Sequence, residues 1–161
     1  MHIIIEGYCV SDWANDPEQR KSTTGYVFTL AEGAVAWMSR SQLIIAISTA
    51  EAEYVAACEA SMEAMAEYNI LQDILPPQCQ IKLRIGIDNQ AAYIMETSLT
   101  YSRRTLHIEL RWHYVREQVQ KGVIDLHKVK VENNPADMFT KPLDKKRLRK
   151  LMHLSGVGDH V

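Results

Sequence analysis

Carboxylates stand where a divalent-metal site would need them, at the ends of predicted strands and the beginnings of predicted helices. Asp88 ends an alternating segment, residues 81–87, and Asp137 follows Asn134 and Pro135, a pair typical of a helix start. Mg²⁺ takes oxygen ligands, and nuclease-type sites combine a few carboxylates with substrate phosphate. Two such ions, roughly 3.5–4 Å apart, can stabilise both the attacking water and the leaving oxygen. Taken singly, Asp88 is as typical of a turn residue as of a metal ligand. Asp137 alone is more typical of an ordinary carboxylate in the first turn of a helix than of a metal ligand.

A further carboxylate comes from the segment that holds Glu51 and Glu53. Ser48 and Glu51 have the spacing of a capping box, which opens a helix that can run to Leu75. Because successive helical residues turn by about 100°, Glu51 and Glu53 lie some 200° apart and cannot enter one site. Glu53 shares its face with a row of alanines that would let the helix approach a sheet closely. The opposite face is also apolar, so the pattern leaves the choice open, and we expect Glu53 to point inward.

The elements that must position these side chains alternate between strands and helices. The second and third predicted strands flank a three-residue loop, 31–33, that contains glycine and is typical of a hairpin. The predicted strands are 2–10, 25–30, 34–38, 81–87 and 123–131, and the predicted helices are 48–75, 89–97, 105–120 and 136–152. The order β-β-β-α-β-α-α-β-α predicts an α/β domain with one mixed sheet flanked by helices.

Length and composition limit the class of protein. A chain of 161 residues with 47% apolar and 24% charged residues is typical of one globular domain. No apolar stretch reaches the roughly 18 residues that a membrane span needs. The three cysteines are an odd count without Cys-x-x-Cys spacing, which favours a reducing compartment. The first residues lack a signal peptide, so we expect an intracellular and cytoplasmic protein, and the Met1 start just before the first strand indicates a detached piece.

Charge is divided unevenly along the chain. Residues 1–100 hold 5 Lys and Arg against 13 Asp and Glu, whereas residues 101–161 hold 13 against 7. One interpretation is that solvated helix faces happen to segregate by charge. The other is a metal-dependent enzyme that acts on a polyanion, with an acidic part that gathers cations and a basic part that contacts phosphates.

Six segments, in order, resemble the ribonuclease H domain of copia-type LTR retrotransposon polyproteins, and together they cover roughly residues 6–150. They are Gly-Tyr-Cys-Val-Ser-Asp-Trp-Ala (7–14), Arg-Lys-Ser-Thr-Thr-Gly-Tyr-Val-Phe (20–28), Ala-Ile-Ser-Thr-Ala-Glu-Ala-Glu-Tyr (46–54), Ile-Asp-Asn-Gln (87–90), His-Ile-Glu-Leu-Arg-Trp-His (107–113) and Ala-Asp-Met-Phe-Thr-Lys-Pro-Leu (136–143). The resemblance implies a ribonuclease H-like fold over residues 1–154, with a five-stranded mixed sheet flanked by helices and a tail, 155–161. It also implies hydrolysis of the RNA strand of RNA–DNA hybrids with two Mg²⁺ or Mn²⁺ ions, beside the reverse transcriptase domain of the same polyprotein.

The family's metal site is built from four carboxylates, and three carry over as Glu53, Asp88 and Asp137. The first strand of the family usually reads Gly-Tyr-x-Asp-x-Asp-Trp, and Val10 stands at the first of those aspartates, whereas Asp12 keeps the second. Asp12 could replace the missing ligand only by spanning roughly 6–7 Å along the strand. The alternative is a catalytically inactive remnant that keeps the fold and binds nucleic acid.

Amide and basic side chains supply the expected contacts to nucleic acid. The candidates are Asn89, Gln90, Arg103, Arg104, Lys141, Lys145, Lys146 and Arg147. The amides could contact sugar and base edges in the minor groove, and the cations could contact phosphates. The run around Lys145 is equally typical of a solvated helix end, where cations suit a C-terminus.

Overall fold

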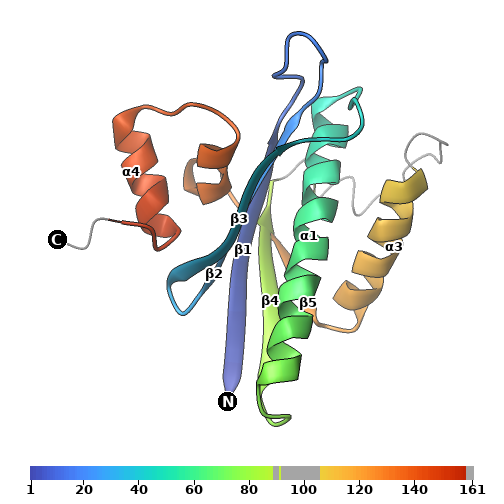
Figure 1. The fold of residues 1–161 in the computed structure, drawn as a ribbon, viewed down its shortest axis with the longest axis vertical. Coiled ribbons are helices and arrows are strands. Elements are labelled where there is room, and N and C mark those ends of the chain that lie inside the picture. Colours follow the sequence, from blue (N-terminus) through green and yellow to red (C-terminus); the bar gives the residue numbers. More distant parts are fainter. Residues whose placement is uncertain (89–90, 92–105, 159–161) are drawn as a thin grey trace.

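The computed structural model describes residues 1–88, Ala91 and residues 106–158, and it contains one five-stranded mixed sheet (Figure 1). The strand order is β3-β2-β1-β4-β5, with β1 antiparallel to β2 and parallel to β4. The strands are β1 (His2–Asp12), β2 (Thr23–Leu30), β3 (Gly33–Ser41), β4 (Gln80–Ile87) and β5 (Ile124–Lys128). The helical elements are α1 (Thr49–Ile74), α3 (Leu106–Gln120), the 3-10 turns η1 (Val131–Asn133) and η2 (Pro135–Phe139), and α4 (Lys145–Leu154). The predicted sheet is confirmed.

The two faces of the sheet carry different elements. Cys9, Tyr26 and Phe28 belong to the main hydrophobic core, which they share with buried residues of α1 and α3. Side chains alternate between faces along a strand, so Val10 and its β2 partner Gly25 face the other way. That second face is covered by η2, because a Cβ added at Gly25 would lie 2.9 Å from the carbonyl oxygen of Ala136. Figure 1 accordingly shows α1 and α3 on one side of the sheet and α4 on the other.

Helix α1 begins and ends as the sequence predicts. The hydroxyl of Ser48 accepts a hydrogen bond from the backbone N–H of Glu51 at 3.1 Å, and Glu51 accepts one from the N–H of Ile47. These contacts satisfy donors at the helix start that have no partner within the helix. The helix stops one residue before Leu75, its C-cap, which precedes two prolines. The alanine face is fully buried, so α1 approaches the sheet closely, as expected.

The hairpin between β2 and β3 is tighter than predicted. Its loop holds two residues, Ala31 and Glu32, rather than three, because Gly33 is already paired with Leu30. Both loop residues have positive φ values, 50° and 67°, as a two-residue turn that matches the strand twist requires.

The C-terminal part departs from the prediction in two places. Strand β5 ends at Lys128, and Val131 begins the turn η1 instead of ending the strand. The expected helix 136–152 is broken into η2 and α4. Pro142 explains the break, since proline lacks an N–H and disfavours the helical conformation of the residue before it. The new helix begins after Asp144, whose side chain accepts the N–H of Arg147 at 3.0 Å.

None of the helices in the described part of the chain is long and apolar enough to span a membrane. Most of the predicted helix 89–97 lies outside the described residues, and Ala91 is its one described helical member.

Candidate functional site

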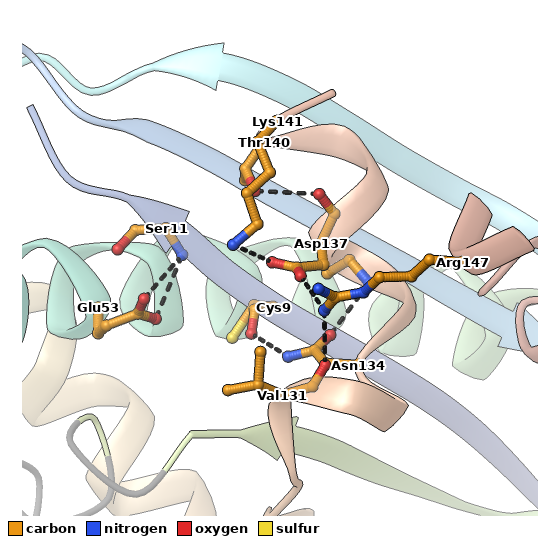
Figure 2. A network of polar contacts seen from close by, with 10 residues as sticks. Cys9, Ser11, Glu53, Val131, Asn134, Asp137, Thr140, Lys141 and Arg147 are labelled. Carbon is orange, nitrogen blue, oxygen red and sulfur yellow. Dashed lines mark hydrogen bonds and ion pairs between the residues drawn. The ribbon is translucent and has the colours of Figure 1, made fainter. Parts of the chain in front are cut away.

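Glu53 points from the start of α1 to the end of β1 (Figure 2). The backbone N–H of Ser11 donates to both of its carboxylate oxygens, at 3.2 Å each, and Glu53 is 5% exposed. Glu51 lies at the helix start, where it contacts Ile47. The prediction that Glu53 is the inward residue is therefore confirmed.

Asp88 follows the last residue of β4 and lies beside the end of β1. Its Oδ1 accepts the backbone N–H of Ala91 at 2.7 Å, which holds the carboxylate against the turn after the strand. The parallel register ends with Tyr8 paired to Gly86, and Val10 and Asp88 each follow two residues after this last pair, where the two strands run side by side. Val10 is 7% exposed. The position that the resemblance assigns to the first catalytic aspartate thus adjoins Asp88, with a valine in it.

Asp137 is fully buried in η2, and Asn134 fixes this turn to β1. The Asn134 side-chain amide donates to the carbonyl of Cys9 at 3.0 Å, and its Oδ1 accepts the N–H of Ala136 at 3.0 Å. Figure 2 shows Asn134 between Cys9 and the turn that carries Asp137. From the sequence, Asn134 is expected only to begin a helix together with Pro135. Its position directly before a proline signals a cap, but nothing local signals the contact with Cys9.

Two cations contact the carboxylate of Asp137. Arg147 Nη2 lies 2.5 Å from Oδ2, and Lys141 Nζ lies 3.2 Å from Oδ1 (Figure 2). The same Arg147 nitrogen donates to the carbonyl of Val131 at 3.3 Å. Lys141 and Arg147 were predicted as phosphate contacts, and the structure places both of them on a buried acid.

Burial and neighbouring charge change the acidity of Glu53. Desolvation by burial is the largest cause that raises the pKa of Glu53. The negative charges of Asp88 and then Asp137 raise it further, to about 8. The hydrogen bonds from Ser11 act in the opposite direction, since they favour the charged form. The charges of Asp88 and Asp137 thus act on Glu53 near the end of β1, and Glu53 holds its proton near neutral pH.

Asp12 lies on the same face of β1 as Val10, two residues further along. It is still paired with Thr23 in the regular β1–β2 ladder, so the strand does not bend to bring Asp12 back toward Val10. Two residues of strand correspond to roughly 6.6 Å. Whether Asp12 takes part in catalysis stays a prediction.

The side chains as they stand do not fit a two-ion centre. Within residues 1–88, Ala91 and 106–158, no group of three or more His, Cys, Asp or Glu is arranged to hold a metal. The described residues therefore form no ready metal centre, and the assignment of Glu53, Asp88 and Asp137 to one metal site stays a prediction. Val10 offers no oxygen to a cation, and the oxygens of Asp137 already face Arg147 and Lys141.

The remaining nucleic-acid candidates divide into exposed residues and residues outside the described part. Lys145 and Lys146 are exposed in the first turn of α4. The expectation that this run suits a helix C-terminus is wrong, because the break at Pro142 moves the helix start to this point. Asn89, Gln90, Arg103 and Arg104 lie outside the described residues.

Retrotransposon polyproteins are among the relatives in sequence. The chain is 36% identical over 154 residues to the "Retrovirus-related Pol polyprotein from transposon TNT 1-94" of Nicotiana tabacum, covering 96% of this chain and 11% of that protein. It is 30% identical to the corresponding polyprotein from transposon RE2 of Arabidopsis thaliana, covering 95% of this chain and 10% of that protein. The chain thus spans about a tenth of these relatives. No model of a protein family matches it.

Ribonucleases H are the relatives in structure. LC11-RNase H1, isolated from compost by a metagenomic approach, matches with a TM-score of 0.58 at 18% identity, over 84% of this chain and 91% of that one. The structure of LC11-RNase H1 in complex with an RNA/DNA hybrid matches with a TM-score of 0.53 at 18% identity, over 84% and 93%. At this identity the likeness establishes the ribonuclease H-like fold. Sequence and fold together confirm the resemblance to the ribonuclease H domain of copia-type retrotransposon Pol polyproteins.

Proposed function

We propose that this chain is a ribonuclease H domain that binds RNA–DNA hybrids and hydrolyses their RNA strand only weakly. The observation that carries the proposal is Val10, which stands beside Asp88 at the end of β1, next to the residue that binds Glu53. Because the relatives are Pol polyproteins, we place the domain beside the reverse transcriptase of the same polyprotein.

Weak hydrolysis follows from what a valine does at this position. Divalent ions in nuclease sites stabilise the attacking water and the leaving oxygen, and carboxylates fix those ions. The methyl groups of Val10 would meet a hydrated cation without compensating its charge. Loss of one such transition-state interaction, worth a few kcal/mol, slows turnover on the order of a hundredfold, at about 1.4 kcal/mol per tenfold.

Hybrid binding rests on the basic C-terminal part. Residues 101–150 hold 13 Lys and Arg against 6 Asp and Glu. Lys145 and Lys146 are exposed at the N-terminus of α4, where the helix dipole opposes positive charge. Their placement therefore does not serve the stability of the helix, and it favours an anionic partner. The structural relative in complex with an RNA/DNA hybrid supports the same class of ligand.

The test is a hybrid-cleavage assay with a labelled RNA strand, in Mg²⁺ and separately in Mn²⁺, together with hybrid binding measured by fluorescence anisotropy. The unaltered chain should bind and cleave weakly, and Val10→Asp should raise cleavage by about a hundredfold without tightening binding. Asp12→Asn is the matched control on the same strand face and should change little. Robust cleavage by the unaltered chain that Asp12→Asn abolishes would refute the proposal, since Asp12 would then replace the missing ligand.

A second candidate function is hybrid binding without any hydrolysis. The contact of Asp137 with two cations favours it, because a carboxylate engaged by Arg147 and Lys141 is less able to hold a metal ion. It predicts that Val10→Asp binds hybrid and still cleaves none.

A further inference from the structure

We infer that Arg147, assisted by Lys141, is the built-in counter-ion of Asp137 and occupies the place that a divalent ion would need on this carboxylate. The inference deepens the proposed function, because it assigns the basic residues nearest the site to the fold rather than to the ligand. It starts from a disagreement: the fold's relatives are nucleases, yet the described side chains do not form a metal centre.

Burial makes a counter-ion necessary. Asp137 is 0% exposed, and an ionised carboxylate removed from water without a partner is very costly. Among the described residues its Oδ1 accepts no hydrogen bond, and the Lys141 ammonium lies 3.2 Å from it, whereas its Oδ2 meets Arg147 at 2.5 Å. Both oxygens of the acid are thus compensated by positive charge that the chain itself supplies.

Arg147 is held in this position from several directions. Its Nη2 bridges Asp137 of η2 and the carbonyl of Val131 in η1, and its backbone N–H is bound by the N-cap Asp144. The break at Pro142 lets the chain turn back so that α4 presents Arg147 to the acid. The ion pair therefore docks α4 onto η1 and η2, and the guanidinium is engaged within the fold instead of facing a phosphate.

This arrangement predicts that the fold does not depend on divalent ions. Adding Mg²⁺ or EDTA to the unaltered chain should move its melting temperature by less than about 1 °C. Arg147→Gln should lower the melting temperature by roughly 5 °C or more, because it removes the main counter-ion of the buried Asp137 carboxylate. Lys146→Gln, an exposed neighbour on the same helix, is the matched control and should change it by less than about 2 °C.

Measurements of Mn²⁺ affinity then distinguish the effect of Val10 on metal binding from the effect of Arg147. Mn²⁺ affinity is measured by electron paramagnetic resonance, which counts free Mn²⁺ and needs no cleavage. Val10→Asp combined with Arg147→Gln should bind Mn²⁺ at least about tenfold more tightly than Val10→Asp alone, whereas Val10→Asp with Lys146→Gln should not. If Arg147→Gln does not fold, Val10→Asp with Lys141→Gln serves in its place, because it removes the second cation on Asp137 while Arg147 keeps the buried charge compensated, and it should still tighten Mn²⁺ binding.

The inference is overturned by equal Mn²⁺ affinity in the Arg147 and Lys146 combinations, by equal melting of Arg147→Gln and Lys146→Gln, or by strong Mg²⁺ stabilisation of the unaltered chain. Its failure is distinguishable from that of the proposed function. Cleavage by Val10→Asp tests the valine alone, and the Mn²⁺ and melting experiments test Asp137 and its counter-ions.

Discussion

Replacing Glu53 by glutamine should stabilise the protein, and the gain should grow with pH. The pKa of this carboxyl is about 8 in the folded chain against 4.5 for the unperturbed group. Below pH 4.5 the group is protonated in both states and contributes nothing to the difference. As the pH rises from about 4.5 to about 8, the unfolded chain loses the proton and the folded chain keeps it, so the free energy of unfolding falls. Above pH 8 both states are ionised and the loss is complete.

The size of the loss follows from the same shift. The rise of the Glu53 pKa from 4.5 to about 8 corresponds to a loss of about 5 kcal/mol at most in the free energy of unfolding, and structural relaxation reduces this loss. Glutamine is uncharged and retains an oxygen for the N–H of Ser11. We therefore expect Glu53→Gln to match the unaltered chain near pH 4.5 and to exceed it by several kcal/mol at pH 8.

Urea unfolding in EDTA, followed by circular dichroism between pH 4.5 and 8.5, measures this difference directly. Other buried acids contribute equally to both proteins and cancel, among them Glu59, whose pKa burial also raises. Glu18→Gln, on an exposed loop, is the control and should show no pH-dependent gain. A Glu53→Gln protein that is less stable at pH 8 than the unaltered chain would refute the reasoning, because it would mean that the Glu53 charge is stabilised in the fold.

Two further predictions concern binding and the turn that carries Asp137. Substituting Lys145, Lys146 and Arg149 together by Gln should reduce the slope of log hybrid affinity against log salt by roughly 2–3, and an unchanged slope would place the hybrid elsewhere. Arg147 is left intact in this variant because of its contact with Asp137. Asn134→Ala should cost roughly 2–3 kcal/mol in urea unfolding, since it leaves the buried carbonyl of Cys9 and the N–H of Ala136 without partners. A loss below about 0.5 kcal/mol would contradict this role for Asn134.

The sequence could predict those parts of the site that depend on local periodicity. The turn angle of a helix separates Glu53 from Glu51, and the alanines on its face favoured Glu53 as the inward residue, although the equally apolar opposite face left the choice open. Asp88 follows from the end of an alternating strand. The break at Pro142 was readable from proline chemistry, although the continuous helix 136–152 was predicted. This error carried over to the basic run, which was assigned to the wrong end of its helix.

Contacts between distant segments were beyond a reading of local pattern. Nothing in the spacing of Arg147 indicates that its guanidinium meets Asp137, because the two residues belong to different elements whose relative position depends on a turn. The same holds for Asn134, whose amide contacts β1 from the far end of the chain. Charge alone assigned Lys141 and Arg147 to contacts with a ligand. In the structure both pair with the buried carboxylate of Asp137.

The hydrogen bond from Asn134 to Cys9 joins residues 125 positions apart, and this separation bears on the order of folding. Closing so long a loop costs more conformational entropy than pairing the consecutive strands β1 and β2. Contacts such as the one from Asn134 to Cys9 therefore form late. During synthesis at about 5–20 residues per second, Asn134 follows Cys9 by ~6–25 s. Over that interval η2 is absent from the sheet face that contains Val10 and Gly25. The N-terminal hairpin must therefore persist with this face uncovered until the C-terminal turn arrives, and the candidate site is completed among the last parts of the molecule.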